Sequence, residues 1–174
     1  MLSVNSEAKE EFYKDKRRFF WLSQPFLPLL PSLSCWFGYT YNLPIVYWLT
    51  ALFWFVLIAI LDETLPADNN NPPEHLLSEI EADNYYYKVL FASTPSYLIN
   101  ITYVCWFVGN HDLPLIDYLG IGISLGIVSG LGLAVGHELG HKTSYFFRRA
   151  GKFLLGISGV PHFIVGHLNG HHRL

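Results

Sequence analysis

The stretch LPLIDYLGIGISLGIVSGLGLAVGHELGHK, residues 113–142, decides how this chain folds. Residues 113–136 carry a single charged side chain, Asp117, and as a helix they are long enough to cross a hydrocarbon core of about 30 Å. The run ends in His137-Glu138-Leu139-Gly140-His141, an HExxH pattern. Because residues four apart share one face of a helix, both imidazoles can bind the same metal ion. The stretch therefore predicts a membrane-spanning helix that ends in a metal site.

Three glycines of this span form a row, with Gly122, Gly126 and Gly130 spaced four residues apart. Such a row of small residues allows two membrane helices to approach closely. We expect this glycine row to face another helix of the protein.

The composition of the whole chain is that of a membrane protein. Of its 174 residues, 51% are hydrophobic, 17% are aromatic and only 14% are charged. Besides 113–136, the apolar runs 19–41, 43–61 and 89–110 can each form a span, and Pro25, Pro28 and Pro31 predict that the first is kinked or partly re-entrant. The predicted fold class is all-α, a single-domain polytopic membrane helix bundle with about four transmembrane helices.

The basic residues predict how the bundle is oriented. They precede the first span, separate the second from the third and follow the fourth, whereas the turns at 41–42 and 110–112 contain no Lys or Arg. By the positive-inside rule, segments 1–18, 62–88 and 137–174 are cytoplasmic, and so are both termini. We expect a multi-pass protein of the cell (inner) membrane with a cytoplasmic histidine cluster. The net charge of −3 gives no reason to expect a nucleic-acid partner.

A second group of histidines follows the first. In HLNGHH, residues 167–172, His167 and His171 repeat the four-residue spacing and His172 is adjacent. A wet membrane interface gives no reason to gather imidazoles that repel one another once protonated, so the two groups indicate metal binding. A catalytic zinc ion takes three protein ligands, so five histidines fit two metal ions better than one. Imidazole binds iron as well as zinc, and the spacing leaves the metal open.

The two histidine boxes resemble those of a known family. HELGHK followed by HxxxHH, after apolar runs and a DNNNPPE turn at 68–74, resembles the integral-membrane alkane hydroxylases (alkane 1-monooxygenases). These enzymes are relatives of the membrane fatty-acid desaturases in the histidine-box superfamily. The family's first box, HELxHK, matches residues 137–142 at every defined position. Its second box matches at His167, Asn169, Gly170, His171 and His172.

The resemblance implies an activity and a set of ligands. Enzymes of this family insert one atom of dioxygen into the terminal C–H bond of an alkane, using a di-iron centre and electrons from rubredoxin. By this resemblance two iron ions are held by His137, His141, His167, His171 and His172. Glu138 is expected to orient a ligand histidine. An alkane dissolved in the bilayer would reach the metals through the bundle, and candidates for the wall of that channel are Phe53, Trp54 and Phe55.

Two departures from the family pattern leave other interpretations open. Gly166 stands where the family has Glu, and the family continues with further spans and a third box of the HxxHH kind. We therefore expect this chain to be the N-terminal part of a longer enzyme. An inactive truncated paralogue and a homo-oligomer that completes the site are two alternatives. An intramembrane zinc protease, with His137 and His141 as ligands and Glu138 as general base, is a third, although it leaves the second box unused.

Overall fold

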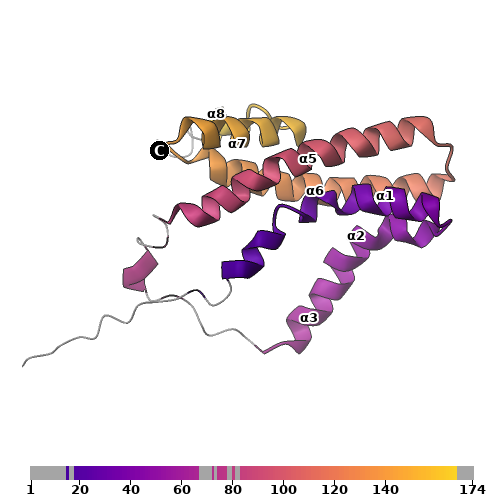
Figure 1. Cartoon of the computed structure of the whole chain (residues 1–174), viewed down its shortest axis with the longest axis horizontal. Helices are drawn as coiled ribbons and strands as arrows, with labels where there is room; N and C mark the ends of the chain where they lie inside the picture. Colours follow the sequence, from indigo (N-terminus) through magenta and orange to yellow (C-terminus); the bar gives the residue numbers. More distant parts are fainter. Residues whose placement is uncertain are drawn as a thin grey trace, which may run out of the picture.

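The computed structural model describes residues 15, 18–66, 72, 74–77, 80 and 83–167, and the regular structure within these ranges is helical throughout. The bundle is built on two long helices, α5 (Asn84–Asn110) and α6 (Leu115–Gly140). Figure 1 shows α1 (Leu30–Thr40) beside one half of α6, and α7 (Tyr145–Ile157) with α8 (Phe163–Gly166) beside the other half. A short η5 (Glu74–Leu76) precedes α5. The predicted all-α class is confirmed.

The first predicted span, 19–41, is interrupted as its prolines indicated. It consists of η1 (Arg18–Ser23), η2 (Leu27–Leu29) and α1, and only α1 is α-helical. Pro28 and Pro31 stand in the first turns of η2 and α1, where the missing backbone N–H costs nothing. With 11 residues, α1 is about 16 Å long, roughly half the thickness of a hydrocarbon core.

Within the described part of the chain, two helices are long and apolar enough to cross a membrane. One is α6, with 26 residues, and the other is a continuous helical run of 21 residues, Pro44–Thr64. This run joins η3 (Pro44–Trp48), α2 (Leu49–Leu52), the π-helical η4 (Phe53–Leu57) and α3 (Ile58–Thr64). Only 17% of its apolar window is buried against the protein, compared with 39% for α6. So large an exposed apolar surface suits contact with lipid.

A buried polar contact fixes α1 against α5. The side-chain carbonyl Oδ1 of Asn100 accepts hydrogen bonds from the backbone N–H of Ser32 at 3.0 Å and from its hydroxyl at 2.6 Å. Asn100 is only 1% exposed. Because an unmade hydrogen bond here would leave buried polar groups unsatisfied, this contact specifies how the two helices are aligned.

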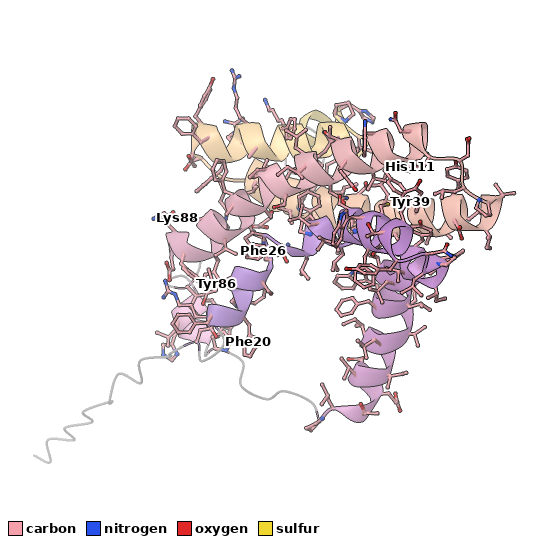
Figure 2. The ribbon with its side chains drawn as sticks, turned by 45° about the vertical axis from the view of Figure 1, so that its right-hand side comes forward. Phe20, Phe26, Tyr39, Tyr86, Lys88 and His111 are labelled. Carbon is pink, nitrogen blue, oxygen red and sulfur yellow. The ribbon has the colours of Figure 1, made fainter. Side chains whose placement is uncertain are left out.

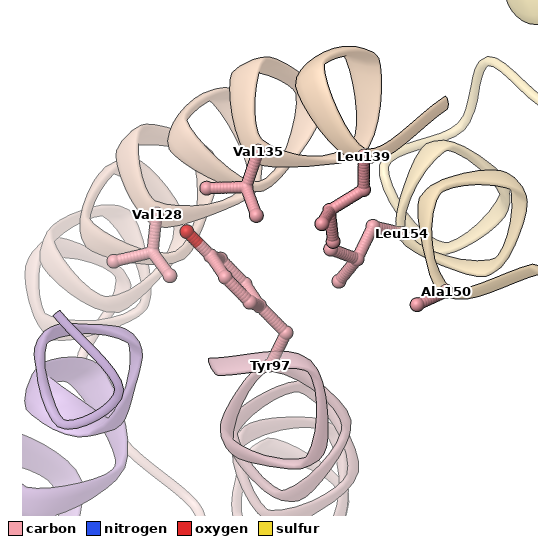
Figure 3. Packing of buried hydrophobic residues seen from close by; sticks show 6 residues of the cluster. All are labelled: Tyr97, Val128, Val135, Leu139, Ala150 and Leu154. Carbon is pink, nitrogen blue, oxygen red and sulfur yellow. The ribbon is translucent and has the colours of Figure 1, made fainter. Parts of the chain in front are cut away.

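The principal core lies where α5, α6 and α7 meet. It contains Tyr97 of α5, Val128, Val135 and Leu139 of α6, and Ala150 and Leu154 of α7. Figure 3 shows the α6 side chains directed toward Tyr97 and Leu154. Leu139 and Leu154 are completely buried, and burial of each such side chain contributes about 1.5–3 kcal/mol. This core packs the C-terminal half of α6, which carries the first histidine box.

Glycines permit the close crossing of α6 and α7. A Cβ atom on Gly151 would lie 2.6 Å from the carbonyl oxygen of Gly136 and 2.7 Å from the amide nitrogen of Gly140. Further along α7, the Ser158 hydroxyl donates to the backbone oxygen of Ser129 at 3.0 Å. Gly151 contacts Gly140, whereas Ser158, which comes later in the chain, contacts Ser129, which comes earlier. The two helices are therefore antiparallel, and the chain turns again at Gly159.

The expectation for the glycine row is wrong. Gly122, Gly126 and Gly130 are exposed, and a Cβ atom on any of them would meet no described atom within 4 Å. The packed glycines of α6 are instead Gly120 against Trp48, Gly132 against Tyr97, and Gly136 against Gly151 and Leu154. Gly120 and Gly122 differ by two residues, about 200° around a helix, so packing on one side leaves the row facing outward.

Candidate metal centre

Three histidines from two helical segments converge at one end of the bundle. His137 lies in the last turn of α6, His141 is its C-terminal capping residue, and His167 directly follows α8. Their Nε2 atoms are separated by 2.9 Å (His137–His167), 3.1 Å (His137–His141) and 3.2 Å (His141–His167). All three side chains are half-buried. The remaining predicted ligands, His171 and His172, lie outside the described residues.

The three nitrogens cannot all satisfy one another by hydrogen bonding. An imidazole Nε2 either donates or accepts in a given protonation state, and each contact needs one donor and one acceptor. In a triangle of three nitrogens, at least one pair must therefore have the same role. A metal ion removes this conflict because it accepts a lone pair from each neutral imidazole at once. The donor set thus fits a cation better than a network of hydrogen bonds.

The distances between the three nitrogens can be compared with the distances between ligands of a single metal ion. At a metal–nitrogen distance of about 2.1 Å, a tetrahedral ion separates its nitrogen ligands by about 3.4 Å. Three ligands at right angles on one face of an octahedron lie about 3.0 Å apart. The observed separations of 2.9–3.2 Å are close to these distances, so the three nitrogens are close enough together to bind one ion.

Phe163 covers part of the histidine group. Its ring stacks on His167 with centroids 5.3 Å apart at an interplanar angle of 15°, and it contacts His137 edge to face at 5.9 Å. An apolar ring in this position limits the access of water and holds the His167 imidazole in a fixed plane. In the sequence, Phe163 lies four residues before His167, a spacing that brings the two side chains together on one helical face.

The carboxylate of Glu138 is directed to Lys142. The two groups form an ion pair of 3.3 Å across one helical turn, and the Lys142 ammonium lies 3.6 Å from the centre of the Tyr87 ring. Burial lowers the pKa of Lys142, but its contacts with Tyr87 and Glu138 outweigh that effect and hold the pKa above its ordinary value. The predicted role of Glu138 in orienting a histidine stays a prediction.

Sequence reasoning missed the contribution of the tyrosines at the start of α5. The Tyr85 hydroxyl donates to the backbone oxygen of Arg18 at 2.6 Å, the Tyr86 hydroxyl donates to Asp15 at 2.7 Å, and Tyr87 contacts Lys142. These three residues tie the N-terminal segment and the end of α6 to α5. Their signal was a run of tyrosines directly before an apolar segment, where amphipathic rings are favoured.

The three predicted channel residues lie in the π-helical η4 and have different surroundings. Phe53 lines an apolar groove of about 550 Å³ between η2, α1 and α2–α3, together with Leu27, Leu30, Leu49 and other apolar side chains. Trp54 is half-buried, and its indole N–H is buried without a hydrogen-bond partner among the described residues. Phe55 is 69% exposed. Of the three, only Phe53 lines this groove.

Comparison with known proteins gives the same family as the resemblance of the histidine boxes. No family model matches the chain. Alkane 1-monooxygenase of Pseudomonas putida is 34% identical over 171 residues, which cover 98% of this chain and 42% of the relative. Alkane 1-monooxygenase 1 of Alcanivorax borkumensis is 33% identical over 168 residues, with 97% and 42% covered. The chain is a homologue of the alkane 1-monooxygenases. The resemblance read from the sequence is thereby confirmed.

A third alkane 1-monooxygenase, from Ectopseudomonas oleovorans, is 34% identical over 161 residues, which cover 92% of this chain and 40% of the relative. The chain therefore spans about two fifths of the length of the curated alkane 1-monooxygenases that it matches. His137, His141 and His167 lie within this shared part.

Proposed function

We propose that this chain forms part of a membrane monooxygenase that hydroxylates the terminal carbon of alkanes, or of related lipid-like hydrocarbons. It would use dioxygen, two non-haem iron ions and electrons from a rubredoxin-type donor. The observation that carries the proposal is the convergence of the His137, His141 and His167 Nε2 atoms within 3.2 Å of one another, in a homologue of the alkane 1-monooxygenases.

The described histidines are suited to one of the two ions. His137, His141 and His167 would hold it through Nε2. His171 and His172, which lie outside the described residues, belong to the ligand set that we propose for the two ions together. Iron supplies the chemistry that activates dioxygen for insertion into a C–H bond. The protein's own contribution would be to hold three imidazoles with their Nε2 atoms together and to shield them with the Phe163 ring. Glu138 and Lys142 hold the end of α6 against Tyr87.

The four-span topology with both termini in the cytoplasm is part of the proposal. Within the described ranges every Lys and Arg lies toward the histidine end of the bundle, which supports a cytoplasmic location of the metal centre in a multi-pass inner-membrane protein. Arg148, Arg149 and Lys152 are exposed on α7, beside this end. A basic surface there favours the approach of an acidic soluble electron donor.

For the substrate we propose entry from the bilayer past η4. A π-helical turn inside an α-helix is frequent at functional sites, and this turn contains Phe53, Trp54 and Phe55. The groove beside Phe53 has almost purely apolar walls, as a hydrocarbon chain requires. His167 lies with the two histidines of the first box, which favours the monooxygenase over a zinc protease that would use only the first box.

Metal analysis and product analysis together test the proposal. The protein is expressed from its native reading frame and purified in nanodiscs, and iron and zinc are measured for the parent and for His137→Ala. Cells that also contain rubredoxin and its reductase are fed a medium-chain alkane, and terminal alcohol is measured by gas chromatography. We expect iron in excess of zinc, and alcohol above the level of His137→Ala.

An exposed histidine next to the site provides the matched control. His162→Ala should keep both the iron and the alcohol yield, because His162 is exposed and no contact of its ring with the three converging Nε2 atoms is described. Zinc at one equivalent, with peptide hydrolysis that Glu138→Gln abolishes, would establish the protease instead. Bound iron without alcohol would support the inactive paralogue.

A further inference from the structure

A cavity of about 540 Å³ lies at the end of the bundle opposite the histidines. It forms where the turn between α1 and η3 meets the turn between α5 and α6. Its polar and aromatic lining residues are Tyr39, Asn42, Tyr47, Asp112 and Asp117. Figure 2 shows Tyr39 and His111 together at this end, far from Lys88 at the other. The cavity is therefore separate from the metal centre.

Asp117 contributes a buried carboxylate to this cavity. The residue is 5% exposed, and its side chain has no hydrogen-bond or ion-pair partner among the residues that the structure describes. Burying an unpaired carboxylate is costly. The N-terminus of α6 offsets part of that cost with a partial positive charge of about half a unit. Because Asp112 adds a second carboxylate, this end of the protein keeps a net negative charge.

The countercharge cannot come from a lysine or arginine of the described chain. The six that are described are Arg18, Lys88, Lys142, Arg148, Arg149 and Lys152, and they lie toward the histidine end. Along α6, Asp117 is about 28 Å from Gly136, well beyond a Debye length of about 8 Å. The His111 ring is held by the backbone oxygen of Phe107 at 2.9 Å and stacks on the Phe107 ring at 4.3 Å.

We propose that this cavity binds an organic ammonium group. Aromatic faces and carboxylates together recognise such cations, and Tyr39 and Tyr47 supply the rings. A bare metal ion needs oxygen ligands about 2.1–2.6 Å away, whereas this cavity has the volume of a site for a small organic group. In the proposed four-span topology, on which this inference rests, the cavity would lie at the depth of lipid headgroups. The ammonium group would then belong to either an ethanolamine phospholipid or a free amine.

Native mass spectrometry of the full chain tests this inference without reference to catalysis. The protein is titrated with phosphatidylethanolamine and, separately, with phosphatidylglycerol of the same acyl chains. Free ethanolamine and calcium are tested alongside. We expect phosphatidylethanolamine to bind at least about ten-fold more tightly than phosphatidylglycerol, as one charge-assisted hydrogen bond would give. Displacement by millimolar ethanolamine would identify a free amine as an equally good ligand.

Matched variants decide whether the cavity is responsible. Asp117→Asn should remove the preference for phosphatidylethanolamine, and Asp112→Asn should reduce it several-fold. Asp62→Asn, at an exposed position of α3, should leave it unchanged. If Asp117→Asn does not fold, as judged by circular dichroism, Tyr39→Leu replaces it and should also reduce the preference. Equal binding of the two lipids, a preference that survives these substitutions, or binding of calcium but no amine would overturn the proposal.

Discussion

The two ends of α6 are built in opposite ways. At its C-terminal end, α7 packs so closely on Gly136 and Gly140 that Gly151 has no room for a side chain. The three histidines converge there, and the described basic residues lie on the same side. At the N-terminal end the neighbours are the turns around Tyr39 and Asp112, which leave a cavity of about 540 Å³. There the charges are carboxylates.

This difference shows that the apolar middle of a helix does not specify what its ends do. Between the two ends α6 has only apolar or small residues, which pack against the neighbouring helices and set the distance between the two ends. Polar function is concentrated where the backbone leaves the apolar layer, because buried charges inside that layer are costly. Which function appears depends on the segments that pack against each end. Three pairs of variants test whether the two ends of α6 differ in this way.

The largest expected effect is the loss of metal from one end only. His141→Ala removes one of three converging nitrogens, and the ion that they hold should be lost because the two remaining imidazoles would bind it only weakly. His111→Ala removes a histidine from the other end and should leave the metal content unchanged. Inductively coupled plasma mass spectrometry of the purified variants measures both. Equal loss in both variants would mean that the histidine end is not the metal centre.

The next effect concerns packing density. Gly151→Ala should destabilise the protein by about 1–3 kcal/mol, because its new Cβ would lie 2.6 Å from a backbone oxygen and the helices would have to separate. Gly122→Ala, in the other half of α6, meets open space and should stabilise by up to about 1 kcal/mol through helix propensity. Unfolding titrations in a mixed detergent system give both values.

Metal content is a second measurement on which Gly151→Ala and Gly122→Ala should differ. Separation of α7 from α6 also moves α8 and His167, so Gly151→Ala should hold less metal than the parent. Gly122→Ala should hold the same amount. A destabilised Gly151→Ala with unchanged metal content would show that α7 does not position His167.

The smallest effect is expected at Tyr87. Its ring holds the Lys142 ammonium at 3.6 Å, so Tyr87→Leu should destabilise by about 0.5–1 kcal/mol, whereas Tyr87→Phe keeps the ring and most of the stability. The same unfolding titration measures the two variants. If Tyr87→Phe loses as much as Tyr87→Leu, the hydroxyl rather than the ring face makes the contact.

The site was predictable in part. The four-residue spacing of His137 and His141 placed both on one face of α6, and the prolines before α1 indicated the interruption of the first segment. The glycine row was assigned to the wrong environment because spacing shows that small residues share a face but not what that face contacts. The contact between Tyr87 and Lys142 joins residues far apart in the chain, and no local pattern predicts such a pair.

By itself, the sequence determined that this protein is helical, apolar along its long segments and supplied with two boxes of histidines at the spacing of metal ligands. These properties follow from composition and short-range periodicity, which act within one helix. Only the tertiary structure decided that His167 meets His137 and His141, because α7 must first run back along α6, and Gly136, Gly140 and Gly151 allow that approach. It also decided that Asp117 faces a cavity with no basic partner among the described residues, since this depends on which turns meet at the far end of the bundle.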